Sequence, residues 1–274
     1  MLMTEPDAGS ASAGPVDECP TSQAGSVSPH FDPPEQTSDK ASASKTARVW
    51  KWCRRAGIGL LGVFLAFHVY ALALILLPSP TTLNMLGTRL SGVDVKRDIT
   101  PIRNISPNLV RAVIAAEDSK FCSHYGIDLE AVRSAFRNNQ QGGRRRGGST
   151  ISQQTAKNIF FWNGGGYVRK AGEAWMTLVT ETIWSKRRIM AHYLNVAEWG
   201  DGIYGAEAAA QIRFGKPASE LTKREAALLA SVLPNPNDWR VDPPGNYVSG
   251  RATTIEQRMR VVESDGLDSC VLGG

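Results

Sequence analysis

Residues 117–128 read Glu-Asp-Ser-Lys-Phe-Cys-Ser-His-Tyr-Gly-Ile-Asp and follow a segment with strong helix signals. Ser106 is a favourable N-cap, and Pro107 suits the first helical position. An apolar stripe with helical spacing then ends in a carboxylate: Val110, Val113, Ile114 and Glu117. A carboxylate in an apolar setting is costly unless it is paired or faces a cleft, where it can serve as a general base. The alternative is a surface Glu at a helix end, and this stretch alone does not decide between the two.

Length and charge set the first limits. The chain has 274 residues, which suits one domain of up to about 200 residues with extensions. Its net charge of +5 favours an anionic partner such as nucleic acid, phospholipid or a phosphorylated substrate, without choosing among them. Residues 1–44 are rich in Ser, Ala, Pro, Thr, Asp and Glu and lack apolar periodicity, so we expect a disordered tail.

A candidate membrane span follows a basic segment at residues 45–55. Residues 56–77 are uncharged and mostly apolar, and as a helix they would extend about 33 Å, enough for a bilayer core. A signal peptide is disfavoured because its apolar part is usually only about 7–15 residues long. Lys and Arg precede the span and are absent after it until Arg89, so the positive-inside rule predicts a cytoplasmic tail and an outer C-terminal part. That side excludes a nucleic-acid partner.

The cysteines and histidines give no metal-ligand spacing, so no zinc site is predicted. On the predicted topology only Cys122 and Cys270 lie outside, where one disulfide between them could form.

The outer part, residues 85–265, has a mainly α-helical pattern with no run of alternating strands. Thr222 and Glu225 have capping-box spacing ahead of an apolar run, and Pro234 ends that run. Residues 167–196 predict one long helix or two consecutive ones. The fold class that we expect is therefore mainly α.

A second polar stretch reads Gly147-Gly-Ser-Thr-Ile-Ser-Gln-Gln-Thr-Ala-Lys-Asn158 and follows a basic loop at residues 142–148. Thr150 and Gln153 have capping-box spacing, and Gln154 and Lys157 share one face of the predicted helix. A glycine-rich entry, a helix N-terminus and a nearby Lys together suit a cluster of anionic oxygens. A P-loop is excluded because no Gly-Lys-Ser/Thr occurs, but a capped surface helix explains the stretch as well.

A third group is formed by Arg169, Lys170 and Glu173, which helical spacing places on one face. One interpretation is an ordinary surface ion pair, worth under about 1 kcal/mol. The other is a second carboxylate held among cations beside a phosphate.

Taken in this order, the stretches resemble the family 51 glycosyltransferases, the peptidoglycan polymerases. The first three motifs of the family resemble the three stretches above. Residues 186–195, with Lys186, Ile189, Tyr193 and Asn195, resemble the fourth motif, and residues 225–236 resemble the last conserved helix. The likeness covers most of residues 90–240. One departure is Ala191, where bifunctional relatives usually have Glu; monofunctional members vary there, so we expect activity to be retained.

The resemblance implies a lysozyme-like helical domain on a single-pass inner-membrane anchor, with a cytoplasmic N-terminus and a periplasmic catalytic domain. The implied reaction polymerises lipid II into β-1,4 glycan strands, with release of undecaprenyl diphosphate, for cell-wall biosynthesis. By motif, Glu117 would deprotonate the acceptor 4-hydroxyl, and Glu173 would lie near the departing diphosphate. The substrate-binding residues that the resemblance implies are Asp118, Phe121, His124, Ser149, Thr150, Gln153, Gln154, Lys157, Asn158, Arg169 and Lys170.

The resemblance also sets expectations for cofactors and partners. It implies no required cofactor and no protein metal site, although a divalent cation (Mg²⁺ or Mn²⁺) is compatible with the diphosphate. The implied partners are lipid II, the lipid-linked glycan chain and the membrane, together with penicillin-binding and division proteins. Residues 127–146 would lie on the membrane, with their arginines at lipid head groups.

Two other functions compete with polymerisation. A lytic or hydrolytic muramidase also uses carboxylates on a lysozyme-like fold, but cleavage of a neutral glycosidic bond needs no cations such as Lys157, Arg169 and Lys170. An inactive membrane scaffold for cell-wall assembly is the non-enzymatic alternative. The presence of both Glu117 and Glu173 argues against it, and Ala191 is the one feature in its favour.

Overall fold

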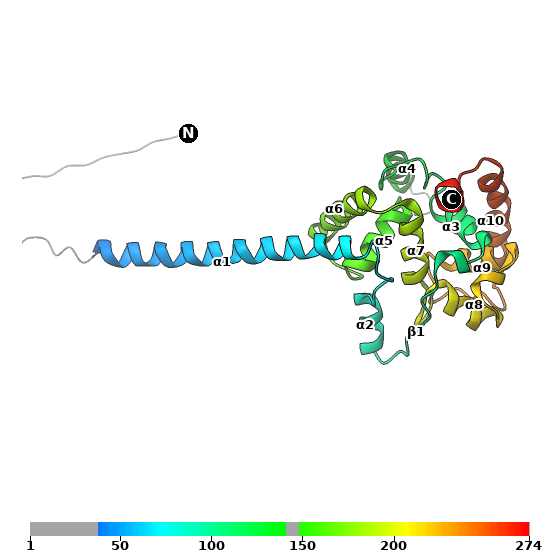
Figure 1. Cartoon of the computed structure of the whole chain (residues 1–274), viewed down its shortest axis with the longest axis horizontal. Helices are drawn as coiled ribbons and strands as arrows, with labels where there is room; N and C mark the ends of the chain where they lie inside the picture. The colour runs from blue at the N-terminus through cyan, green and yellow to red at the C-terminus, as the bar shows by residue number, and fades with distance from the viewer. Residues whose placement is uncertain (1–37, 141–147, 274) are drawn as a thin grey trace, which may run out of the picture. The chain divides into compact units, whose positions relative to one another are not determined.

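The computed structural model describes residues 38–140 and 148–273 (Figure 1). Residues 1–37 of the predicted tail lie outside the described residues, and so do residues 141–147, which include all of the predicted basic loop except Gly148. The chain forms two compact units, residues 1–56 and 57–274. The described part of the first unit is the beginning of helix α1 (Ser38–Ala73), and the second unit holds the end of α1 and every other described element.

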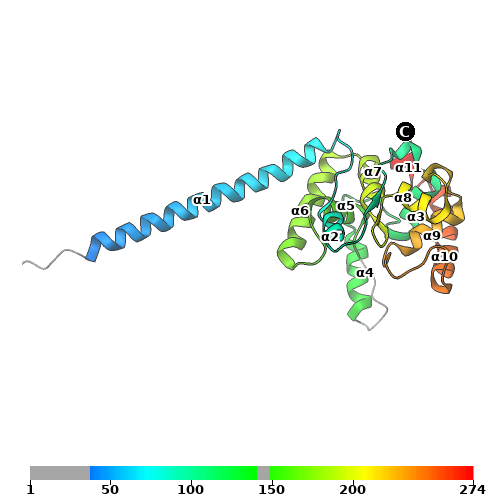
Figure 2. The same ribbon diagram turned by 90° about the horizontal axis from the view of Figure 1, so that it is seen from below.

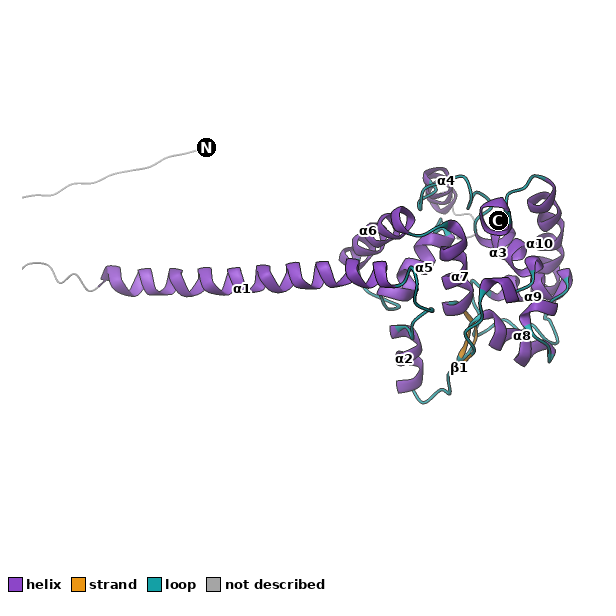
Figure 3. Cartoon of the chain, in the orientation of Figure 1, coloured by secondary structure: helices purple, strands orange, loops and turns teal. Residues whose placement is uncertain are grey.

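The second unit is mainly α-helical, as predicted, and Figure 3 shows how little strand it contains. Two 3₁₀ turns are η1 (Ile102–Asn104) and η2 (Ala218–Glu220). The strands are β1 (Lys96–Arg97), β2 (Glu198–Gly200) and β3 (Ile203–Tyr204). The remaining helices are α2 (Leu83–Leu90), α3 (Pro107–Glu117), α4 (Leu129–Gln140), α5 (Ile151–Phe160), α6 (Tyr167–Ile183), α7 (Lys186–Val196), α8 (Ala206–Phe214), α9 (Lys223–Val232), α10 (Asn246–Ser264) and α11 (Ser269–Leu272).

The strands form one small sheet in the order β1-β3-β2. β1 pairs with β3 in parallel, with Lys96 opposite Ile203, and β2 pairs with β3 antiparallel, with Glu198 opposite Tyr204. Strands of two or three residues are too short to show an alternating pattern in the sequence. They could not be predicted for that reason.

Two groups of helices make up the core of the second unit. Helices α3, α9 and α10 pack together, and α5 packs against both α6 and α7 (Figures 1 and 2). The largest side chains with almost no exposure include Trp199, Tyr193 and Phe121. The predicted caps are present: Ser106 caps α3, and Thr222 and Glu225 form the capping box of α9. Glu117 is the last residue of α3. It therefore lies at the junction between the two groups of helices, directly before the polar loop that connects α3 to α4.

Residues 167–196 form two helices rather than one. α6 ends at Ile183, and Ser185 caps α7 by accepting a hydrogen bond from the Arg188 N–H at 3.2 Å. A serine at an N-cap position favours a new helix start over continuation. This break decides between the two alternatives that the sequence left.

Helix α1 differs from the prediction at both ends. It begins at Ser38, so residues 38–44, predicted to belong to the disordered tail, are helical. Extension of an existing helix costs little, and the Ala and Lys residues in this segment are good helix formers. The part long and apolar enough to cross a membrane is Arg48–Ala73, whereas the predicted span was 56–77. Residues 74–77 continue as turns rather than as α-helix.

Backbone carbonyls at the end of α1 accept hydrogen bonds from side chains elsewhere in the second unit. The Trp184 indole N–H donates to Ala71 O at 2.9 Å, and Arg188 Nε and His192 Nε2 donate to Leu74 O at 2.9 and 3.0 Å. Burial lowers the pKa of His192 to about 4, so its ring is neutral near pH 7. These side chains satisfy carbonyls that the end of a helix leaves without partners.

One disulfide joins two distant parts of the second unit. Cys122, in the loop after α3, is bonded to Cys270 in α11, with 5.6 Å between their Cα atoms. The two residues are 148 positions apart, so the bond closes a long loop. Among the described residues, Cys53 is the free cysteine, and it is exposed.

We expect the disulfide to contribute roughly 3–5 kcal/mol to the free energy of unfolding, because a cross-link over a long loop restricts the unfolded chain strongly. Replacing Cys122 and Cys270 together by Ala should lower the denaturant midpoint accordingly. Cys53→Ala is the matched control and should leave the midpoint unchanged. A loss below about 1 kcal/mol in the double variant would contradict this prediction.

Candidate active site

The carboxylate of Glu117 is held in a largely enclosed place at the end of α3. Its side chain is 14% exposed. One oxygen accepts a hydrogen bond from Gln154 Nε2 at 2.9 Å, and the other lies 3.8 Å from a terminal nitrogen of Arg251. Gln154 comes from α5 and Arg251 from α10, so both groups of helices position this one carboxylate.

Electrostatics suit Glu117 for proton transfer. Burial raises the pKa of its carboxyl, and the nearby Asp118 adds to this shift, while the Gln154 hydrogen bond and the Arg251 charge oppose it. A carboxylate whose pKa is moved up towards the working pH is a better general base than an ordinary surface Glu. The structure therefore favours the cleft interpretation of this residue over a surface position.

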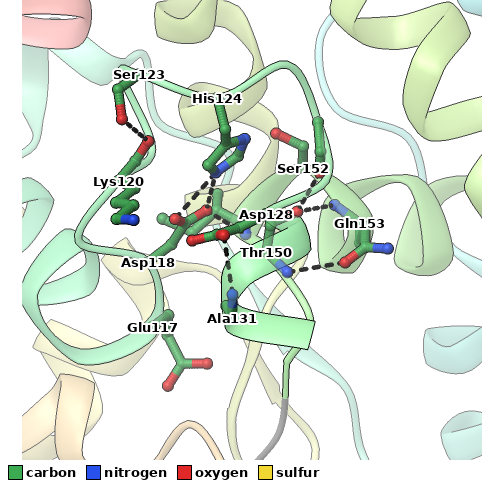
Figure 4. A network of polar contacts seen from close by, with 12 residues as sticks. Glu117, Asp118, Lys120, Ser123, His124, Asp128, Ala131, Thr150, Ser152 and Gln153 are labelled. Atoms are coloured by element: carbon green, nitrogen blue, oxygen red, sulfur yellow. Dashed lines mark hydrogen bonds and ion pairs between the residues drawn. The ribbon is translucent and has the colours of Figure 1, made fainter. Parts of the chain in front are cut away.

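Asp118, the next residue, has a different environment. Its side chain is 2% exposed and accepts hydrogen bonds from the Ile151 N–H at 3.1 Å and from His124 Nε2 at 2.9 Å. A carboxylate at the N-terminus of α5 interacts favourably with the free N–H groups and the helix dipole. Figure 4 shows the Glu117 side chain pointing away from this cluster. Asp118 and His124 thus fix the loop after α3 to the start of α5. Their predicted contact with substrate stays a prediction.

Other predicted binding residues are also engaged in the framework. Thr150 and Gln153 form the predicted capping box of α5 (Figure 4). The Thr150 hydroxyl also donates to Gly126 O at 2.5 Å. Phe121 is fully buried in the core. Ser149, in contrast, is exposed ahead of α5. The framework of the site thus includes the buried side chains of Phe121, Thr150 and Gln153, whereas Ser149 is accessible to a ligand.

A buried ion pair ties these motifs to α7. Lys186 Nζ lies 2.7 Å from a carboxylate oxygen of Glu181 and donates to His124 O at 2.9 Å. Glu181 also accepts from the Ser152 hydroxyl on α5. The sequence placed Lys186 in the fourth motif without a role. It missed Glu181, because the two partners of this residue, Ser152 and Lys186, lie on other helices.

A polar cavity of about 240 Å³ is lined by Gln154, the hydrogen-bond partner of Glu117. Gln154 connects the two, because its amide oxygen accepts from the Tyr193 hydroxyl at 3.4 Å while its amide nitrogen donates to Glu117. Lys157 and Asn158 line the cavity as well, as the sequence predicted for a binding site. The cavity thus lies within reach of both the candidate base and a buried cation.

Three cations from two helices meet near this cavity. Burial lowers the pKa of Lys157, and the neighbouring charges of Lys170 and Arg169 lower it further, while the carboxylate of Glu198 opposes this shift. Lys157 forms no ion pair among residues 38–140 and 148–273. A partly buried cation with two more cations close by favours binding of an anion.

Glu173 holds two of these cations in place. Its side chain is 2% exposed, forms an ion pair with Arg169, and lies 3.1 Å from Lys170 Nζ. The interpretation as an ordinary surface ion pair is therefore wrong, because this carboxylate is buried. The structure instead matches the alternative of a second carboxylate held among cations.

The arrangement does not suit a resident metal ion. Among the described residues no three His, Cys, Asp or Glu side chains lie close enough to hold one. Hard divalent cations take several oxygen ligands, whereas Glu173 is already paired with Arg169 and Lys170. A divalent cation would have to arrive with its own anionic ligand.

Some residues of the site were not found from the sequence. Arg251 and Glu198 had no recognised motif, and Tyr193 was noted in the fourth motif without a role. Asn84, from α2, lines the cavity with Glu198. Only tertiary packing brings α2, β2 and α10 to Glu117 and Lys157, and no local spacing reports that packing.

Comparison with known proteins identifies the family. The model of the Transglycosylase family matches residues 84–262. The chain belongs to the transglycosylase family. It is 49% identical over 223 residues to the "Biosynthetic peptidoglycan transglycosylase" of Rhodospirillum centenum, which covers 80% of this chain and 95% of that relative.

Two more relatives of the same name extend this result to other bacteria. The protein of Caulobacter vibrioides is 48% identical over 216 residues, covering 77% of this chain and 94% of the relative. That of Aeromonas hydrophila subsp. hydrophila is 53% identical over 166 residues, covering 61% and 71%. The predicted family and the mainly helical fold of this transglycosylase are confirmed, and an enzyme is favoured over an inactive scaffold.

Proposed function

We propose that this transglycosylase is a peptidoglycan glycosyltransferase that polymerises lipid II into β-1,4 glycan strands and releases undecaprenyl diphosphate. The main support is one arrangement: Gln154 links the enclosed carboxylate of Glu117 to a cavity that is lined by Lys157, a cation with Arg169 and Lys170 close by and no ion pair within the described residues. A base beside an anion site suits attack by a sugar hydroxyl on a donor activated by diphosphate. The name of the relatives points to peptidoglycan as the product.

In the proposed mechanism Glu117 accepts the proton of the acceptor 4-hydroxyl as that oxygen attacks C1 of the donor sugar. The bond between C1 and the diphosphate oxygen breaks, and the diphosphate leaves with the bonding electrons. Attack opposite the leaving group converts an α-linkage into a β-1,4 linkage. Lys157, with Arg169 and Lys170, stabilises the charge that grows on the diphosphate, and Glu173 keeps the latter two in place.

The direct test is turnover of labelled lipid II by the purified full chain in detergent. We expect glycan polymer that muramidase digests, together with released undecaprenyl diphosphate. Cleavage of finished, lipid-free peptidoglycan without polymerisation would instead support the hydrolase. The cluster of Lys157, Arg169 and Lys170 near the cavity favours the polymerase, because hydrolysis of a neutral glycosidic bond needs no such group.

The proposal includes a location: a single-pass inner-membrane protein with its catalytic unit in the periplasm. Support comes from the basic residues between Lys45 and Arg55, which precede the uncharged apolar part of α1, and from the disulfide Cys122–Cys270. Disulfides persist mainly in oxidising compartments such as the bacterial periplasm.

We expect a phosphatase reporter fused after Gly274 to be active, because alkaline phosphatase itself requires an oxidising compartment. The matched fusion carries a reporter that is active only in the cytoplasm, at the same position. Activity of the cytoplasmic reporter with an inactive phosphatase would reverse the proposed orientation.

Membrane contact beyond the span is proposed for residues 127–146. Their described part includes α4, which projects from the rest of the second unit in Figures 1 and 2 and exposes Leu129 and Val132. Exposed apolar side chains on an otherwise polar helix suit the surface of a bilayer. Lipid II, the lipid-linked glycan chain, and penicillin-binding and division proteins are the partners that fit this location.

A further inference from the structure

A second cavity, of about 530 Å³, lies where the candidate membrane span ends. Leu76 and Pro78, from the segment that follows α1, line it. Residues of η1 and α7 line it as well, among them Arg103, Arg187 and Arg188. If α1 crosses the bilayer as proposed, this cavity lies at the level of the lipid head groups.

The cavity is strongly cationic. None of its lining residues is acidic, and none of the three arginines forms an ion pair within the described part of the chain. Arg188 donates to the carbonyls of Leu74 and Leu77, and Arg187 donates to another backbone carbonyl. Carbonyls orient these guanidinium groups but carry no net charge, so the positive charge is not neutralised.

Arg103 is the most accessible of the three. It lies in η1, is exposed, and makes no hydrogen bond with residues 38–140 or 148–273. Guanidinium groups bind phosphate oxygens in a fork geometry, with stronger hydrogen bonds than neutral donors give. Apolar side chains, among them Leu76 and Ile102, line the same cavity and suit the start of an acyl chain.

The cavity is separate from the catalytic one, although both use α7. Tyr193 lines the cavity beside Gln154, whereas Ala191 and Asn195 line the cationic cavity. Side chains two positions apart on a helix point about 200° apart, so they face different sides of it. Ala191 therefore does not bear on the catalytic cleft. Its small side chain leaves room among the arginines.

We propose that this cationic cavity binds the phosphate head group of an anionic glycerophospholipid in the leaflet where α1 emerges. The inference rests on the membrane-spanning role proposed for α1. It assigns a lipid site that is distinct from the substrate site. Head-group binding there fixes the height of the catalytic unit above the bilayer, because Arg188 joins the cavity to the backbone at the end of α1.

The test measures binding to the purified full chain in an uncharged detergent, without lipid II. The probes are a short-chain phosphatidylglycerol, a phosphatidylcholine of the same chain length, and inorganic phosphate. We expect phosphatidylglycerol to bind about 10-fold or more tightly than phosphatidylcholine, and an equal concentration of inorganic phosphate not to displace it. Equal binding of the two lipids, or displacement by inorganic phosphate, would overturn the lipid assignment.

Variants locate the site. Arg103→Ala should weaken phosphatidylglycerol binding roughly 10-fold, the effect of losing one charged hydrogen bond, and leave phosphatidylcholine binding unchanged. Ala191→Glu puts a carboxylate among the arginines and should remove the preference for the anionic lipid. Arg260→Ala, an exposed arginine on α10, is the control and should bind like the wild type. A full preference retained in both Arg103→Ala and Ala191→Glu would overturn the proposal.

Melting temperature and lipid II turnover distinguish loss of the lipid site from loss of the fold or of the polymerase. Arg103→Ala should melt at the wild-type temperature, because exposed residues without partners contribute little to stability, so its result does not depend on the fold of Ala191→Glu. Lipid II turnover by Ala191→Glu in uncharged detergent should match the wild type. If Ala191→Glu loses the lipid preference but keeps lipid II turnover, the lipid site is separate from the polymerase site. The proposed polymerase function fails only if the wild type itself does not polymerise lipid II.

Discussion

Glu117→Gln is expected to lower lipid II polymerisation by roughly 10²–10⁴-fold, the usual contribution of a general base. The substitution keeps the shape of the side chain and can still accept the Gln154 hydrogen bond, but it cannot take up the hydroxyl proton. The fold should be unaffected or slightly stabilised, because burial of the carboxylate charge is unfavourable in the wild type, as its raised pKa indicates. The measurements are turnover of labelled lipid II and melting temperature for the same preparation.

Asp118→Asn is the matched control at the neighbouring position. Asp118 accepts hydrogen bonds from the Ile151 N–H and from His124 in a buried place, so its loss should lower the melting temperature along with activity. A catalytic role predicts lost turnover at full stability, and a positioning role predicts that both fall together. Near-normal turnover by Glu117→Gln would remove Glu117 from the mechanism.

The pH profile gives a second test of the same residue. The base must be deprotonated, so activity falls as the pH drops through the pKa of Glu117. Because burial raises that pKa, the acid limb should lie above the value of about 4.3 for an ordinary Glu. Arg251 favours the charged form, and so Arg251→Ala should move the limb to still higher pH. If Arg251→Ala leaves the acid limb of the pH profile unchanged, a group other than Glu117 controls that limb.

The sequence predicted which helices and caps form this site better than it predicted the role of each residue in it. The apolar stripe of α3 and the capping box of α5 were predicted from spacing, and both are present. The same residue types serve as caps and as ligands, however. Thr150 and Gln153 cap α5 through their hydrogen bonds, as predicted, and their contact with substrate stays a prediction. Only the burial of each side chain separates the two roles.

Long-range contacts were the part that spacing could not predict. Arg251 reaches Glu117 because α10 packs against α3, and nothing in the local pattern of α10 marks that residue. Spacing also left two interpretations of Glu173 open, a surface ion pair or a carboxylate held among cations, and its burial favours the second. Position 191 was compared with relatives as part of the cleft, but the side of α7 that it faces belongs to the other cavity.

The environment of Glu173 also decides which cation can be substituted to test the anion site without destabilising the fold. Arg169→Ala would leave the buried Glu173 carboxylate with Lys170 alone, and removing one partner of a buried pair typically costs about 3–5 kcal/mol. The sequence suggested that Arg169 was exposed and could be removed at little cost, and its burial contradicts that. Arg169→Lys keeps the charge beside Glu173 and tests only the fork geometry of the guanidinium.

Lys157→Ala is expected to lower polymerisation by roughly 10²–10³-fold, by analogy with the loss of one donor to a developing negative charge. The interaction strengthens as charge grows on the leaving diphosphate, so kcat and kcat/KM should fall together. Stability should not fall, because burial and the neighbouring cations already disfavour the Lys157 charge. Lys223→Ala, which removes an exposed lysine paired with Glu263, is the control and should leave turnover unchanged. Turnover within about threefold of the wild type in both Lys157→Ala and Arg169→Lys would rule out a diphosphate site at these cations, since one lost contact there should cost far more than that.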